Sequence, residues 1–316
     1  MPMTELASGI TVHTFRPPPE DFDPTKADDR ELVAHGLPRR PEDPDLRERW
    51  ESLLGRKIRL IEPVFRQIEH RHGRLPKRTS ERRTSAAEHA VDSTDIWAGA
   101  LLDSPGGDKF AWIQGTWNVP NAYPPVNPEA GITYSASAWI GIDGYDGSND
   151  VLQIGVDSLA LYVFNSTIHT HLVWWEWFPG ATFEITNLPV AAGDTVSGLV
   201  CVDPDSSTTA SVSLYNVTTN IGASFRATAP DGFDLLGNTA QWIVERLVSD
   251  TGIHVPELAR FGDVYFDDAN AGTLGRQLLR GGNGNVVEMT DFGNVIATGV
   301  IETPTLIQVR YTGPNY

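Results

Sequence analysis

Two stretches of this chain decide its fold: Ala138-Trp139-Ile140-Gly141-Ile142-Asp143-Gly144, which continues to Val151-Leu152-Gln153-Ile154-Gly155-Val156-Asp157, and Asn238-Thr239-Ala240-Gln241-Trp242-Ile243-Val244-Glu245-Arg246. Both are apolar runs of strand length that contain one misplaced polar residue, Gln153 or Glu245. Because side chains alternate along a strand, Gln153 shares a face with Val151, and Glu245 shares a face with Ile243. An unpaired polar group on an apolar face costs about 1–3 kcal/mol. The pair therefore forms either a buried hydrogen bond that holds the sheets or a reaction centre, and spacing alone leaves both interpretations open.

Similar short runs follow one another from Ile96 to the end of the chain. They are rich in Val, Ile, Thr, Trp and Tyr, and they are separated by Gly, Pro, Asn and Asp. Many alternate apolar with polar residues, as half-buried antiparallel strands do. Further strands are predicted at 110–119, 136–142, 159–164, 172–178, 195–202, 210–217, 241–247, 263–266, 295–300 and 305–311. This pattern, with little helical periodicity, predicts an all-β fold built as a two-sheet antiparallel sandwich or a barrel.

Residues 1–92 differ from residues 93–316 in charge. The first part carries 17 basic and 17 acidic residues, whereas the second carries 7 basic and 24 acidic residues and so holds the whole net charge of −17. We therefore expect a boundary after residue 92. The span 56–83 holds ten Lys and Arg residues against three Glu residues, which predicts electrostatic docking on the acidic domain. A nucleic-acid-binding tail and a solvated helix face are the alternatives.

The N-terminal part is expected to be partly helical. Residues 1–40 are rich in Pro and charge, which indicates extended chain with little core of its own. A helix is predicted over 42–54, with Asp43 or Asp45 as its cap, because its apolar residues lie on one face. A second helix is predicted from 63 to about 72, with Pro63 in its first turn. Residues 77–85 are expected to form an exposed linker.

Charge and composition argue against several partners. The acidic surface repels nucleic acid and anionic membranes, so neither is expected as a partner. No run approaches the roughly 18 apolar residues that a membrane helix needs. The first residues lack the basic and apolar regions of a signal peptide. Cys201 is the single cysteine, so neither an internal disulfide nor a cysteine metal cluster is possible.

Among catalytic groups, paired carboxyls have the strongest support. His169-Thr170-His171 lacks a nearby third ligand, so no metal site is predicted, and no Gly-x-Ser-x-Gly elbow is present. Glu176 lies in the aromatic stretch Trp174-Trp175-Glu176-Trp177-Phe178-Pro179. A glycosidase that uses Glu176 and Glu245 is one possibility. A lectin-like sandwich that binds carbohydrate through its nine tryptophans without catalysis is another.

The chain from about Trp97 onward resembles the glutamic peptidases, also called eqolisins. The matching stretches are Trp97-Ala98-Gly99-Ala100, Gly115-Thr116-Trp117-Asn118-Val119-Pro120, Ser137-Ala138-Trp139-Ile140-Gly141-Ile142-Asp143-Gly144, Leu152-Gln153-Ile154-Gly155-Val156-Asp157, Trp175-Glu176-Trp177-Phe178-Pro179 and Asn238-Thr239-Ala240-Gln241-Trp242-Ile243-Val244-Glu245. They occur in the family order and cover roughly two thirds of the chain.

The resemblance implies a jelly-roll, concanavalin A-like β-sandwich and an acid-acting endopeptidase that hydrolyses proteins or peptides without a metal or cofactor. By motif, Gln153 and Glu245 take the catalytic positions. The positions that line the family's substrate site are matched by Trp97, Trp139, Asp143, Glu176 and Phe178. A monomer in a secreted or acidic compartment is expected.

The resemblance also has departures. Phe178 lacks the hydroxyl of the family's second tyrosine in this stretch, and Leu172 stands at about the position of a family aspartate. Both changes bear on subsite preference rather than on the catalytic pair. Residues 1–92 occupy the place of a propeptide, and the basic span 56–83 suits an inhibitor of the acidic domain. We therefore expect the chain's own N-terminal segment to act as an inhibitor, released at low pH.

Overall fold

The computed structural model describes residues 3–56, 58–69, 72, 83–84, 89–145, 147–247 and 257–314. The N-terminal part contains β1 (Met3–Glu5), η1 (Ala7–Gly9), β2 (Thr11–Thr14), α1 (Asp29–Ala34), α2 (Pro44–Leu54), β3 (Arg59–Ile61), β4 (Phe65–Gln67) and β5 (Arg83–Thr84). The rest contains β6 (Ala90–Thr94), β7 (Trp97–Asp103), η2 (Pro105–Gly107), β8 (Phe110–Asn118), β9 (Thr133–Asp143), β10 (Val151–Val163), β11 (Ser166–Phe178), β12 (Thr182–Ile185), β13 (Thr195–Asp203), β14 (Ser206–Asn216), β15 (Ile221–Thr228), β16 (Thr239–Glu245), β17 (Asp263–Thr273), β18 (Leu278–Arg280), η3 (Gly281–Asn283), β19 (Asn285–Asp291), β20 (Asn294–Thr303) and β21 (Leu306–Tyr311). Among these described elements, no helix is long and apolar enough to cross a membrane.

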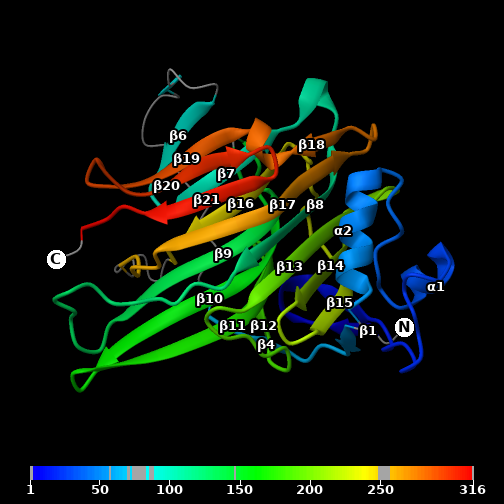
Figure 1. Cartoon of the computed structure of the whole chain (residues 1–316), viewed down its shortest axis with the longest axis horizontal. Helices are drawn as coiled ribbons and strands as arrows, with labels where there is room; N and C mark the ends of the chain where they lie inside the picture. The colour runs from blue at the N-terminus through cyan, green and yellow to red at the C-terminus, as the bar shows by residue number, and fades with distance from the viewer. Residues whose placement is uncertain are drawn as a thin grey trace.

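The strands form a continuous hydrogen-bonded sheet that folds over on itself (Figure 1). One layer, which we call sheet I, has the antiparallel order β12–β11–β10–β9–β16–β7. The other layer, sheet II, has the antiparallel order β17–β8–β13–β14–β15. Strands β19, β20 and β21 join β7 to β17 at one side. The prediction of an all-β two-sheet sandwich with a partly helical N-terminal segment is confirmed.

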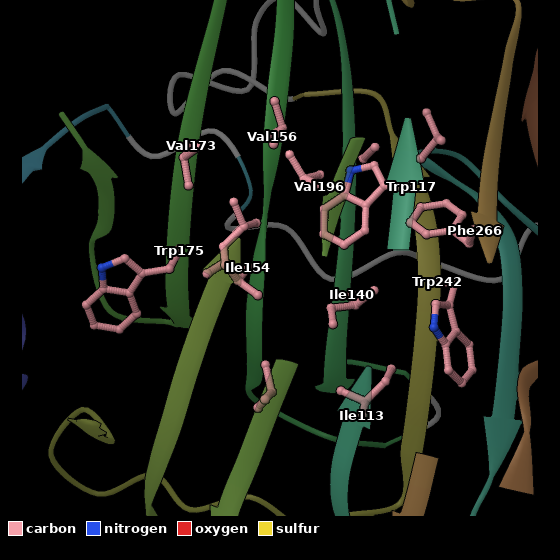
Figure 2. Close-up of a cluster of buried hydrophobic side chains, with 14 of the residues drawn as sticks. Ile113, Trp117, Ile140, Ile154, Val156, Val173, Trp175, Val196, Trp242 and Phe266 are labelled. Atoms are coloured by element: carbon pink, nitrogen blue, oxygen red, sulfur yellow. The ribbon is translucent and has the colours of Figure 1, made fainter. Parts of the chain in front are cut away.

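The main core lies between the two sheets. Figure 2 shows Ile140 and Trp242 of sheet I beside Trp117 of sheet II, and all three are buried. The tryptophans fit because two strands of sheet II carry glycine at the contact. A Cβ at Gly115 would lie 2.9 Å from a ring atom of Trp242, and one at Gly198 would lie 3.0 Å from the Trp117 ring. One face of sheet I is filled by this packing against sheet II, so the side chains that alternate with these core residues lie on its opposite face.

The predicted helix over 42–54 is confirmed as α2. Asp43 caps it by accepting the backbone N–H of Leu46 at 3.0 Å, and its buried residues include Trp50. The expectation that residues 1–40 are extended chain is wrong in part. Helix α1 forms there, and Leu32 packs with Trp50 and Tyr215 in a small second cluster. These residues gain a core by covering sheet II, which local composition does not reveal.

The predicted helix from 63 to about 72 is wrong. Residues Phe65–Gln67 form β4, which extends the edge of β12 as an antiparallel strand. The Phe65 ring packs against Trp175 and Phe225, with centroid distances of 5.9 and 5.0 Å. Because a sheet edge offers unpaired backbone groups, pairing and burial outweigh a weak local helix pattern. Of the predicted linker 77–85, only β5 lies within the described residues. The boundary after residue 92 stays a prediction, and β6 spans it.

Candidate active site

The face of sheet I that points away from the main core carries the candidate site. Glu245 in β16 pairs with Ser137 in β9, and Ser137 pairs with Asp157 in β10. Directly paired residues of antiparallel strands project on the same face, so these side chains form one row. Gln153 lies on this face of β10 too, because it stands four residues before Asp157. Its partner in β11 is Glu176.

The carboxyl group of Glu245 is fully buried and oriented by indoles. Trp139 donates its indole N–H to Oε2 of Glu245 at 2.9 Å. Trp97, the cross-strand partner of Glu245 in β7, packs edge to face on Trp139 with a centroid distance of 4.9 Å. Burial raises the pKa of the Glu245 carboxyl, and this outweighs the lowering by His72, Trp97 and Trp139. The structure therefore brings Glu245, Trp97 and Trp139 into one cluster.

Gln153 and Glu176 form a second buried pair on the same face. Nε2 of Gln153 donates to Oε2 of Glu176 at 2.8 Å, and the hydroxyl of Thr182 donates to Oε1 at 2.8 Å. Within the described part of the chain, Oε1 of Gln153 has no hydrogen-bond partner. Burial raises the pKa of Glu176 to about 7, although the His72 cation and the two donors lower it. Glu176 is thus the group that fixes the Gln153 amide.

Two glycines let Trp139 lie between these pairs. Gly141 and Gly155 are the neighbours of Gln153 and Trp139, respectively, across the β9–β10 ladder. A Cβ at Gly155 would lie 2.5 Å from Cβ of Trp139, and one at Gly141 would lie 3.0 Å from the Trp139 ring. Both contacts are too close for a side chain. Gly141 and Gly155 therefore leave open the space that the indole of Trp139 occupies.

Asp143 and Phe178 lie at the ends of their strands, in one row with Val151 of β10. The carboxylate of Asp143 accepts the backbone N–H groups of Gly237 at 2.8 Å and Asn238 at 2.7 Å. It therefore holds the loop that leads into β16. Burial raises the pKa of Asp143 despite these bonds. The roles of Asp143 and Phe178 at a substrate site stay predictions.

The sequence analysis missed His72, which lies on the Glu245 side of the site. The ring is fully buried, with Nδ1 3.0 Å from Oε2 of Glu245 and Nε2 3.2 Å from Oδ1 of Asp157. It also stacks on Trp174, with a centroid distance of 3.5 Å and an interplanar angle of 10°. Burial alone lowers the pKa of His72, but the carboxylates of Asp157 and Glu245 outweigh it and raise the pKa to about 10. His72 is thus an imidazolium held between two carboxylates.

Asp157 and Trp174 were also missed, although strand alternation could have revealed them. Asp157 follows Gln153 by four residues and Trp174 precedes Glu176 by two, so each projects on the face already identified. No local pattern marks His72. Within the described ranges, no group of three or more His, Cys, Asp or Glu side chains could hold a metal ion.

Comparisons with known proteins show which sequences and structures this chain resembles. Residues 95–311 match the model of the Peptidase A4 family. Aspergillopepsin-2 of Aspergillus niger is 27% identical over 63% of this chain and 72% of its own length. Scytalidopepsin B of Scytalidium lignicola is 28% identical over 52% of this chain and 55% of its own length.

The solved structures show the same fold. A crystal structure of scytalido-glutamic peptidase with a transition-state analogue inhibitor superposes with a TM-score of 0.58 and 23% identity, over 69% of this chain and 98% of that one. The fold and the family match together define the protein as an endopeptidase of the glutamic type. The chain belongs to the Peptidase A4 family, the eqolisins.

Proposed function

We propose that Glu245 and Gln153 carry out peptide-bond hydrolysis at acid pH. Hydrolysis of an amide needs an activated water and a stabilised oxyanion. The observation that supports this assignment is the buried carboxyl of Glu245, oriented by the Trp139 indole on the sheet face that also carries the Gln153 amide. Membership of a peptidase family favours this function over the lectin-like and glycosidase alternatives.

Glu245 acts first as a general base and then as a general acid. In its ionised form it takes a proton from the water that attacks the scissile carbonyl carbon. It later gives this proton to the nitrogen of the leaving amine as the C–N bond breaks. The indole N–H of Trp139 favours the ionised form and fixes the carboxylate in place.

Gln153 supplies an amide without a second negative charge. Its carbonyl oxygen accepts a hydrogen bond from the attacking water, and its NH₂ group donates to the developing oxyanion. In the structure this NH₂ group is held by Glu176, whose pKa is raised to about 7 by burial. At acid pH the neutral Glu176 attracts the NH₂ group less than its carboxylate does, so the amide is free to serve the oxyanion.

The test is a digest of a denatured protein from about pH 2 to pH 6, around the carboxyl reference range. We expect Glu245→Gln and Gln153→Ala each to reduce cleavage by at least about a hundredfold, in line with loss of a general base or an oxyanion donor. Gln308→Ala is the control, because Gln308 is a buried amide in β21. Near-normal cleavage by Glu245→Gln would exclude the assignment.

We further propose that the segment around His72 inhibits this site in the full-length chain. Strand β4 holds the preceding residues on the edge of sheet I, where Arg66 forms an ion pair with Glu184. The backbone N–H of Val64 also bonds to Oδ1 of Asn187 at 2.9 Å. The His72 ring lies 3.0 Å from Glu245, which supports a segment that competes with substrate for this carboxyl group.

Low pH weakens this inhibitory contact. The acidic groups near the His72 ring are Glu245 of β16, Asp157 of β10 and Glu176 of β11. Because the pKa of His72 is raised to about 10, the ring stays cationic in acid, while Glu176, whose pKa is raised to about 7, becomes neutral. The attraction between the ring and this site is then weaker, and the segment is released more readily.

A further inference from the structure

Asp157 is a buried carboxyl group that the described strands of sheet I leave without a hydrogen-bond donor. Its side chain is fully buried, and neither carboxylate oxygen has a hydrogen-bond partner within the described residues. Its charged contact is the His72 ring, 3.2 Å from Oδ1. Its direct strand neighbours are Leu172, which is apolar, and Ser137, whose hydroxyl accepts the indole N–H of Trp174 at 3.0 Å and forms no hydrogen bond with Asp157. A buried carboxylate that receives no hydrogen bond from the surrounding sheet is costly, so this one requires a cationic partner, which in this chain is the His72 ring.

Trp174 supplies a flat surface beside this carboxylate. The His72 ring lies parallel to the indole at a centroid distance of 3.5 Å. The face of an indole attracts cations, and planar cations such as guanidinium stack on it. Asp157 and Trp174 together therefore offer what a planar cationic side chain needs, one charge partner at its edge and one aromatic surface along its face.

We propose that Asp157 and Trp174 form a substrate subsite for a basic side chain next to Glu245, and that His72 fills this subsite from within the chain. The proposal rests on the peptidase function proposed above and names the substrate class, peptides with a basic residue near the cleaved bond. One imidazole ring spans Glu245 and Asp157, so the subsite lies one side chain away from the reacting carboxyl. The acidic domain, with its net charge of −17, also attracts basic peptides.

Binding measurements test the subsite separately from catalysis. The protein is the full chain carrying His72→Ala and Glu245→Gln, which vacates the subsite and prevents cleavage. Peptides of eight residues, alike except for arginine or its neutral isostere citrulline at one scanned position, are titrated in a calorimeter at about pH 5, where a free Asp is ionised. We expect at least one position at which arginine lowers Kd at least tenfold relative to citrulline.

The same titration is repeated with Asp157→Asn added, and separately with Asp205→Asn added. Asp205 is an exposed acidic residue in the turn between β13 and β14, so it controls for loss of one charge. Asp157→Asn should reduce the arginine preference to within twofold, and Asp205→Asn should leave it unchanged. An equal loss in both variants would show that general charge attraction causes the preference, and the subsite would be rejected.

The proposal stays testable if Asp157→Asn fails to fold, as judged by near-UV circular dichroism. In that case the scan of the protein with unaltered Asp157 decides. If arginine is preferred by no more than twofold at every scanned position, the subsite is rejected. The catalytic assignment is judged independently from the digest with Glu245→Gln. Each proposal can therefore fail while the other stands.

Discussion

Nδ1 of His72 lies 3.0 Å from Oε2 of Glu245, although 173 residues separate the two in sequence. The contact joins the basic N-terminal part to the sheet face that carries Gln153 and Glu245. The basic segment is therefore linked to the acidic domain by more than its overall charge, because one histidine ring contacts one particular carboxyl group. The chain therefore carries an occupant of its own candidate active site.

The first prediction concerns activity of the full-length chain. His72→Ala removes the imidazolium between Glu245 and Asp157, so substrate meets less competition at mildly acid pH. We expect initial cleavage of a denatured protein at about pH 5–6, above the usual carboxyl pKa, to rise at least about tenfold. The measurement is a progress curve taken before any shortening of the chain is visible on a gel.

His35→Ala is the matched control. His35 belongs to the same N-terminal part, but its ring contacts Phe22 and the backbone of Arg16. This variant should behave as the wild type does. If His72→Ala and the wild type start at equal rates, the ring does not block the site.

The second prediction concerns stability at neutral and alkaline pH. The pKa of His72 is about 10 in the folded chain and 6.5 as its ordinary value. A raised pKa stabilises the fold fully below 6.5, and this stabilisation is lost as the pH rises through about 10. The free energy of unfolding of the wild type, relative to His72→Gln, should therefore fall by several kcal/mol over this window, since each pKa unit is about 1.4 kcal/mol.

Denaturant unfolding at intervals across this window measures the difference. His35→Gln supplies the baseline for changing one histidine outside the site. A wild-type advantage that stays constant up to alkaline pH would contradict an imidazolium paired with two carboxylates.

Strand alternation explains how much of the site could be read from sequence. Gln153 and Glu245 interrupt apolar runs, and period-two spacing correctly assigned each to one face of its strand. The same alternation places Asp157, four residues after Gln153, on the same face of β10. Aspartate is usually exposed in folded proteins, however, so only the fold shows that this one is buried.

His72 could not be predicted from local sequence. Its place depends on β4 joining the edge of β12, where Arg66 meets Glu184 across 118 residues. The short pattern around Phe65 suits a helix or a strand, and only the unpaired edge of β12 decides between them. Long-range pairing of this kind leaves no signal in a window of ten residues.

The third prediction concerns the acid limb of the pH–rate profile. The Trp139 indole N–H lowers the pKa of Glu245, so Trp139→Phe should raise that pKa. As the pH falls, a general base with a higher pKa becomes protonated, and so inactive, at a higher pH. The acid limb of kcat should therefore move upward by about 1–2 pH units, as loss of one hydrogen bond to a charged group implies.

Trp242→Phe provides the control for loss of indole volume, because Trp242 lies in β16, the strand that pairs with the strand of Trp139. Trp242 lies on the core face of β16 and donates its N–H to the carbonyl of Gln114 at 2.8 Å. It should lower stability without moving the acid limb. Equal profiles for the two variants would show that the Trp139 donor does not tune Glu245.

The fourth prediction concerns another buried carboxyl group, that of Asp150. Burial raises its pKa to about 7, although Trp177 and Ser148 donate to it and lower the pKa. For a raised pKa, the stabilisation is complete below the ordinary value of 3.8 and is lost as the pH rises through about 7. The wild type therefore loses stability over this window because it must keep an ionised carboxylate out of water.

Asp150→Asn has no proton to lose and keeps an oxygen for the Trp177 indole. Its free energy of unfolding, relative to the wild type, should rise between about pH 4 and pH 7 and then level off. We expect a gain of a few kcal/mol, since each pKa unit corresponds to about 1.4 kcal/mol. Asp205→Asn, in an exposed turn, should give a nearly flat difference over the same range. A flat difference for Asp150→Asn as well would mean that burial does not hold this carboxyl in its neutral form.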